Sequence, residues 1–250
     1  MRKIYISADV EGLNGVVNPS QIACDYSIPY NEMCLQLHKE LNALIKGLKL
    51  AGVEDIVIND AHGAMNNIAL SELPEDVTLI TGKPKPVSMM YGLHESFDAV
   101  IFLGCHAKVC SNGVLAHTFN MAFKDVKLNG ATVGEAQLNA IFAASKGVGI
   151  VLASGDDVLC SQIKEDIGNI TTIETKKAIS FSAAVCRKNE ELLEEYIQTA
   201  SKVNNLPIIT YPVSDNYIIE IELADGKCEK FSSSDYEEVY KFMQKISATV

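Results

Sequence analysis

The stretch that decides the fold of this chain is Lys3-Ile4-Tyr5-Ile6-Ser7-Ala8-Asp9-Val10-Glu11-Gly12. Apolar and polar residues alternate in it as they do in a β-strand, and two carboxylates follow where the strand should end. In an extended chain, residues two apart point to the same side, so Asp9 and Glu11 can direct their oxygens at one point. Carboxylates placed in this way repel each other unless a cation lies between them. Taken alone, the stretch fits a metal site and a solvated polar strand end equally well.

The bulk composition limits the class of protein. The chain has 250 residues, 48% of them hydrophobic, which is enough for a large α/β core with or without a smaller second lobe. Its formal net charge of −11 argues against nucleic acid or an anionic membrane surface as a partner. No apolar run reaches the roughly 18 residues of a membrane span, and the start lacks the pattern of a secretory leader. We therefore expect a cytoplasmic protein.

The cysteines do not suggest a metal or disulfide framework. There are seven, an odd number, and none forms a Cys-x-x-Cys pair. We expect most of them to be reduced, buried, small apolar residues. Any metal ion in this protein should then be held by oxygen and nitrogen ligands.

The order of predicted elements indicates an α/β fold with a mostly parallel sheet flanked by helices. We expect residues 1–205 to form the core that carries the site, and residues 206–250 to form a smaller C-terminal α+β lobe packed on it. The predicted core strands are 3–8, 55–59, 77–80, 99–103, 149–153 and 171–174, with a hairpin edge at 126–130. The predicted helices are 30–50, 89–97, 133–146, 158–167 and 189–203, and the lobe should contain a strand at 218–223 and a helix at 234–246.

Three of these strands end in residues that bind metals. The side chains concerned are Asp9, Glu11, Asp60, His62 and His106. Because functional sites in open parallel sheets gather at the carboxyl ends of the strands, we expect these residues to lie close together. Glu135 begins a predicted helix and could face the same edge. Two histidines with several carboxylates suit one or two divalent ions, with zinc the first choice.

His117 is a further candidate, in an otherwise apolar stretch eleven residues after His106. It could be a core histidine with a satisfied hydrogen bond. It could also be a general base or nucleophile next to the metal site.

Five motifs occur in an order that resembles a known family. They are Ser7–Gly12, Asn59–His62 with Met65–Asn67, Gly104–Ala107, Gly113–His117 and Val133–Glu135. Together they resemble the D-aminopeptidases of the dipeptide-operon type, the zinc peptidases of family M55. The resemblance covers residues 1–157 well and the remainder loosely.

The resemblance implies a function and a set of roles. It implies a binuclear zinc site whose ligands are Asp9, Glu11, His62, His106 and Glu135. Asp9 would bridge the two ions, and His117 matches the position of the catalytic nucleophile or base. The family releases N-terminal D-amino acids from short peptides and forms ring-like homodecamers whose sites face an inner chamber.

Two other functions remain open from the residues alone. The same ligands would serve a binuclear amidohydrolase or phosphoesterase. A phosphoesterase usually needs additional cations, and Lys108 is the only Lys or Arg close to a motif. The second alternative is a metal-stabilised assembly protein without catalytic activity.

Overall fold

The computed structural model describes residues 1–249 and contains two sheets. The main sheet has seven strands in the order β3-β2-β1-β4-β7-β8-β9, and all neighbours run parallel except β8 and β9. Its strands are β1 (Lys3–Ala8), β2 (Asp55–Asp60), β3 (Val77–Ile80), β4 (Ala99–Cys105), β7 (Ile150–Asp156), β8 (Thr171–Ser180) and β9 (Ala183–Cys186).

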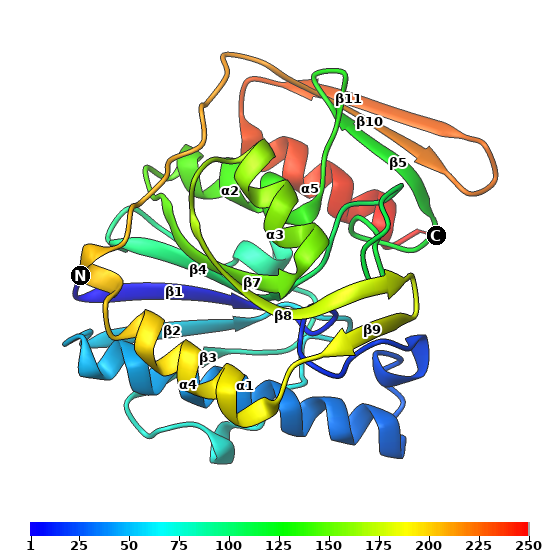
Figure 1. Ribbon diagram of the computed structural model, residues 1–250. Coiled ribbons are helices and arrows are strands. Elements are labelled where there is room, and N and C mark those ends of the chain that lie inside the picture. Colours follow the sequence, from blue (N-terminus) through cyan, green and yellow to red (C-terminus); the bar gives the residue numbers. More distant parts are fainter. Residues whose placement is uncertain (250) are drawn as a thin grey trace.

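Helices cover both faces of this sheet, and a second sheet lies beyond them (Figure 1). One face is covered by α1 (Ile28–Leu50) and α4 (Asn189–Ala200), and the other by α2 (Glu135–Ser145), α3 (Asp157–Asp166) and α5 (Tyr236–Ser247). The second sheet is antiparallel, in the order β11-β10-β5-β6, and α5 packs against it. Its strands are β5 (Phe123–Leu128), β6 (Ala131–Thr132), β10 (Tyr217–Leu223) and β11 (Cys228–Ser233).

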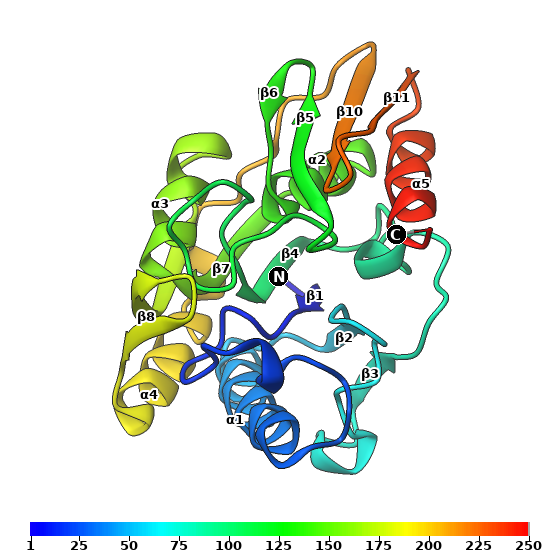
Figure 2. The same cartoon turned by 90° about the vertical axis from the view of Figure 1, so that its right-hand side faces the viewer.

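The observed architecture confirms the predicted α/β class. Every residue of β4 and β7 is buried, which explains why the two strands are largely apolar and do not alternate, with Ser154 and Asp156 as buried polar residues of β7. Strands β2 and β3 lie on one side of β1 in the sheet, and β4, which follows them in the chain, lies on the other side of β1. Such a change of direction opens a crevice at the carboxyl ends of the strands. Figure 2 looks onto this edge of the sheet.

Some elements differ from the sequence-based expectation. The helix predicted at 89–97 is wrong, because only a 3-10 turn forms at Ser88–Met90. Gly92 follows it with a φ of +88°, a left-handed conformation that ends a helix. Strand β9 was not expected, because Ala183–Cys186 has no alternation of apolar and polar residues, although it pairs with β8 across a two-residue turn.

The smaller sheet takes strands from both sides of residue 206. β10 pairs with β11 on one edge and with β5 on the other, so the hairpin predicted at 126–130 is confirmed as part of this sheet. The division into a core at 1–205 and a lobe at 206–250 stays a prediction. Within residues 1–249, no helix combines the length and the apolar character that a membrane crossing requires.

The backbone after β1 crosses the backbone at the end of β4 at very close range. The Gly12 N–H donates to Gly104 O at 2.7 Å. A Cβ atom on Gly12 would lie 1.9 Å from the carbonyl oxygen of Cys105, and one on Gly104 would lie 2.3 Å from Asp9 O. Only glycine fits at either position, and the crossing brings the residues after the two strands together.

We expect Gly12→Ala to lower the free energy of unfolding by about 3 kcal/mol or more, because the obstructing atom belongs to the backbone and has little freedom to move. The control is Gly226→Ala, at a φ of +84° with open space around its Cβ position, which should cost only about 1 kcal/mol. Chemical denaturation of the two metal-free variants measures the difference. Equal losses would show that the crossing relaxes without cost.

Candidate metal centre

The register of the central strands aligns the predicted ligands. Ala8 in β1 pairs with Asp60 in β2 and with Leu103 in β4, so the three strands end at the same level. The segments that follow β1, β2 and β4 carry four of the predicted ligands, which are Asp9, Glu11, His62 and His106. Glu135 is the first residue of α2 and points to the same place. The structure therefore brings all five predicted ligands together.

Asp9 and Glu11 converge on the centre because they lie in a turn after β1, and not because they alternate along a strand. β1 ends at Ala8, and the Leu13 N–H donates to Val10 O at 3.1 Å. Asp9 Oδ1 and Glu11 Oε1 nevertheless lie 3.4 Å and 3.0 Å from the same atom, His62 Nδ1. The expectation that the acids converge is correct, although the extended geometry assumed for them is not.

A second group of donor atoms lies beside the first. His106 Nε2 is 3.1 Å from Glu135 Oε1, and His117 Nε2 is 3.8 Å from the same oxygen. Asp9 links the two groups, since its Oδ2 lies 3.6 Å from His106 Nε2 while its Oδ1 faces His62. One carboxylate is thus shared between two clusters of donors.

Each histidine is oriented by a backbone carbonyl on its outer side. A carbonyl oxygen only accepts hydrogen bonds, so the ring nitrogen facing it must carry a hydrogen. The other ring nitrogen then faces the centre with a lone pair for a proton or a metal ion. The outer contacts are His62 Nε2 to Ile22 O (3.0 Å), His106 Nδ1 to Ala107 O (3.1 Å) and His117 Nδ1 to Leu115 O (2.8 Å).

The electrostatic environment separates His117 from the other two histidines. Burial disfavours the charged ring of His106, but the surrounding carboxylates, Glu135 foremost, raise its pKa to about 10. The charge of Glu11 likewise outweighs burial and raises the pKa of His62 well above its usual value. For His117, burial and the neighbouring His106 lower the pKa. The negative potential that draws protons onto the first two rings would also attract a cation.

The Asp9 carboxylate is in an unfavourable state without a cation, whereas the neighbouring histidines outweigh burial and lower the pKa values of Glu11 and Glu135. Burial and the charge of Glu11 raise the pKa of Asp9 to about 7. Four buried side-chain atoms among residues 1–249 have no hydrogen-bond partner, and two of them, Glu11 Oε2 and His106 Nε2, lie at this centre. Buried polar atoms are rarely left in this way, and a missing ion is one of the ordinary explanations.

The donor set fits a divalent metal. Ligands placed about 2.1 Å from a tetrahedral zinc ion lie about 3.4 Å from one another. The donor atoms described above are separated by 3.0–3.6 Å in the pairs around His62 and His106. Oxygen and imidazole donors in this combination suit zinc better than calcium or magnesium, which prefer oxygen alone.

Lys176 holds the segment that carries Glu11, a role that no sequence motif indicates. The side chain is fully buried, and its Nζ donates to Glu11 O at 2.6 Å, Leu13 O at 2.7 Å and Val16 O at 2.5 Å. These three acceptors match the three hydrogens of an ammonium group. The neighbouring Thr175 hydroxyl donates to Gly12 O. β8 thus fixes the turn after β1.

Two buried aspartates at strand ends hold loops instead of facing the centre. Asp60 accepts hydrogen bonds from the backbone of Asn67 and Ile68, and Asp156 accepts one from the Val114 N–H at 2.6 Å. They fix the segments that carry His62 and His117. The strand-end rule identified Asp60 as a candidate, but only the packing around it distinguishes a ligand from a residue that holds a loop.

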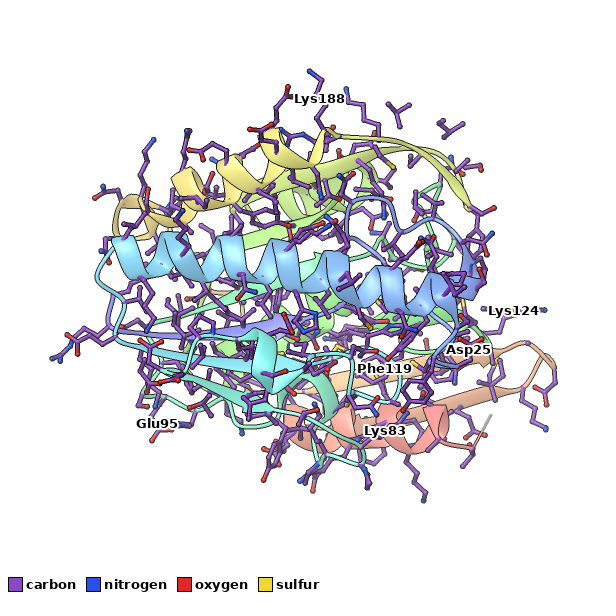
Figure 3. The ribbon with its side chains drawn as sticks, turned by 90° about the horizontal axis from the view of Figure 1, so that it is seen from below. Asp25, Lys83, Glu95, Phe119, Lys124 and Lys188 are labelled. Atoms are coloured by element: carbon purple, nitrogen blue, oxygen red, sulfur yellow. The ribbon has the colours of Figure 1, made fainter. Side chains whose placement is uncertain are left out.

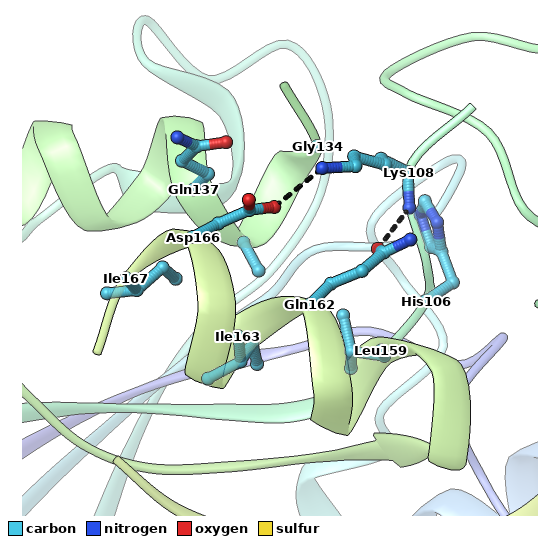
Figure 4. A pocket seen from close by; sticks show the side chains of 10 residues that line it. His106, Lys108, Gly134, Gln137, Leu159, Gln162, Ile163, Asp166 and Ile167 are labelled. Atoms are coloured by element: carbon cyan, nitrogen blue, oxygen red, sulfur yellow. Dashed lines mark hydrogen bonds and ion pairs between the residues drawn. The ribbon is translucent and has the colours of Figure 1, made fainter. Parts of the chain in front are cut away.

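The segment after His106 is anchored to α3, as Figure 4 shows. Lys108 Nζ lies 2.7 Å from Asp166 Oδ2, and the Lys108 N–H donates to Gln162 Oε1 at 2.9 Å. The cavity between them has a volume of only about 10 Å³, enough for one water molecule. The cation that could have served a phosphoesterase is therefore already paired.

The donor atoms open onto a cavity of about 210 Å³. Besides the five predicted ligands and His117, its walls include Met89, Phe119, Asn120 and Met121. This space is large enough for a small substrate group next to the metal centre.

Known proteins resemble this chain in both sequence and structure. The sequence model of peptidase family M55, described as D-aminopeptidase, matches residues 1–245. A D-aminopeptidase of Bacillus subtilis strain 168 is 33% identical over 235 residues, which cover 91% of this chain and 84% of the relative. The solved structure of the zinc-dependent D-aminopeptidase DppA of Bacillus subtilis, a self-compartmentalizing protease, matches with a TM-score of 0.91 and 28% identity, over 98% of this chain and 97% of that one.

Proposed function

We propose that this chain, which belongs to the peptidase M55 family of D-aminopeptidases, is a zinc-dependent aminopeptidase with a binuclear site. The proposed ligands are Asp9, Glu11, His62, His106 and Glu135, and the proposed substrates are short peptides with an N-terminal D-amino acid. The observation that carries the proposal is the position of Asp9, whose two oxygens face the two separate donor clusters.

The proposed site residues would have separate roles in metal binding and proton transfer. Bound zinc would polarise the scissile carbonyl and lower the pKa of a bound water from about 16 toward 7. The buried carboxylates hold the metal and favour a positively charged substrate amine nearby. His117, whose lowered pKa keeps it neutral, would accept a proton or attack the carbonyl through Nε2.

We also propose that the chain assembles into a homo-oligomer, a ring-like decamer whose sites face an inner chamber. The solved relative is a self-compartmentalizing protease. In support, the β8–β9 hairpin exposes 67% of Ile179, 44% of Phe181 and 60% of Val185, a cluster of apolar side chains that a partner copy could cover. We propose further that the protein is cytoplasmic, as expected from its sequence.

Metal analysis tests the proposal directly. Elemental mass spectrometry of purified protein, without added metal, should find close to two zinc ions per chain. The protein should then hydrolyse D-aminoacyl anilides faster than their L-isomers, and aryl phosphates not at all. Absence of metal after zinc has been offered and dialysed away would contradict the ligand assignment. Metal that raises thermal stability without hydrolysis of any substrate would favour the non-catalytic alternative.

A further inference from the structure

The Met65–Asn67 motif contains none of the proposed metal ligands, yet its last residue binds the backbone of one. Asn67 is only 4% exposed, and its Nδ2 donates to His62 O at 2.8 Å and to Asp60 Oδ1 at 2.7 Å. The Asn67 N–H donates to the other oxygen of Asp60 at 2.6 Å. Both hydrogens of the side-chain amide are thus used, and they fix the peptide of His62 relative to the end of β2.

The remaining polar atom of this amide binds the first turn of α1. Asn67 Oδ1 accepts a hydrogen bond from the buried Tyr30 hydroxyl at 2.8 Å. Asn66 makes a longer contact of the same kind, from its Nδ2 to the Tyr26 hydroxyl at 3.4 Å. The two asparagines of the motif therefore join the turn after β2 to α1 and to the loop that precedes it.

That loop also orients the ring of His62 from its outer side. It carries Ile22, whose carbonyl oxygen lies 3.0 Å from His62 Nε2. The loop packs closely on the turn after β2, since a Cβ atom on Gly63 would lie 2.6 Å from Cys24 Sγ. In Figure 3, α1 crosses the front of the molecule, and Asp25 of the loop is labelled at the end where α1 begins. The motif thus joins the two segments that set the position of this ligand, its own backbone and the loop that holds its ring.

We propose that Asn67 is a positioning residue for the metal site, which fixes His62 in the orientation that binds the ion, with Tyr30 as its support. This inference rests on the proposed ligand assignment and goes beyond it, since neither Asn67 nor Tyr30 is a proposed ligand. His62 belongs to the donor group formed with Asp9 and Glu11, whereas the second donor group is carried by α2 and by segments that follow β4. Loss of the Asn67 contacts should therefore weaken the binding of one ion and leave the other unchanged.

Zinc titration of the metal-free protein, in competition with a chelating dye, tests this inference. We expect Asn67→Ala to weaken the binding of one zinc ion about tenfold or more, as is usual for a residue that holds a metal ligand, and to leave the second ion unchanged. The matched control is Asn139→Ala, because Asn139 is similarly buried and its side chain hydrogen-bonds to Met89 Sδ and the Tyr240 hydroxyl. It should lower the melting temperature of the metal-free protein by a similar amount without changing the affinity for either ion.

A milder pair of variants decides the question if Asn67→Ala does not fold. Tyr30→Phe removes only the hydroxyl that donates to Asn67, and it should weaken the binding of the same ion about threefold. Its control is Tyr236→Phe, which removes another buried hydrogen bond, to Leu138 O at 3.0 Å, and should leave both zinc affinities unchanged.

The outcomes separate this inference from the proposed function. Unchanged affinities for both ions in the Asn67 and Tyr30 variants, with or without a loss of stability, would overturn it, because the contacts would then serve folding alone. Equal weakening of both ions would also contradict it. A wild-type protein that takes up no zinc would instead overturn the ligand assignment, and the inference with it.

Discussion

His117→Ala should lower kcat by about 10²- to 10⁴-fold while the metal content stays unchanged, as expected when a group that transfers a proton is removed. The His117 ring stacks on His106 at a centroid distance of 3.9 Å and an interplanar angle of 10°. Its Nε2 lies farther from Glu135 Oε1 than His106 Nε2 does, 3.8 Å against 3.1 Å. His117 thus lies in the same group of possible metal-binding residues as His106 and Glu135, so the metal content of the variant distinguishes a ligand from a group that transfers a proton.

The matched variant for this prediction is His106→Ala. It removes the stacked neighbour, a proposed ligand, and should lower both the metal content and the activity. Elemental analysis and turnover should be measured on the same preparations, with thermal melts of the metal-free forms to check folding. Loss of one metal equivalent in His117→Ala would identify His117 as a ligand. Full activity in that variant would remove it from the mechanism.

Asp9→Asn should abolish the stabilisation by zinc without weakening the metal-free protein. In the wild type, a metal at a thousand times its dissociation constant adds about 4 kcal/mol to the free energy of unfolding. In the metal-free fold, however, the Asp9 carboxylate is buried against Glu11, which raises its pKa to about 7. A raised carboxyl pKa means that the charge destabilises the fold above that pH. At pH 8, the neutral amide should leave the metal-free protein at least as stable as the wild type.

Thermal melts at pH 8, with zinc and with a chelator, measure both parts of this prediction. The control is Asp60→Asn, because Asp60 is equally buried but accepts hydrogen bonds from Asn67 and Ile68 instead of facing the centre. It should lower the melting temperature in both conditions. A zinc-dependent increase in Asp9→Asn as large as that of the wild type would show that Asp9 is not shared between two ions.

Much of the fold follows from local patterns in the sequence. The apolar run of β4 identifies a strand that is buried on both faces. The alternation in β1 also identifies a strand, although Ile4–Ala8 are all buried and Ser7 does not face solvent. Four of the five predicted ligands could be found because parallel strands place their carboxyl ends at one edge, whereas Glu135 begins helix α2. Helix α1 could be located by its spacing of leucines, with its first residue two positions before the predicted start.

Sequence patterns alone therefore establish the class of fold, the strand ends and the chemical types gathered there. Packing between distant segments, in contrast, places Asp9 between two donor clusters, turns Asp60 away from them and sets Lys176 against the turn after β1. Packing also pairs β5 with β10, from a distant part of the chain. Local periodicity records which side of a segment is buried, whereas hydrogen-bond partners and registers are fixed only when distant segments pack together.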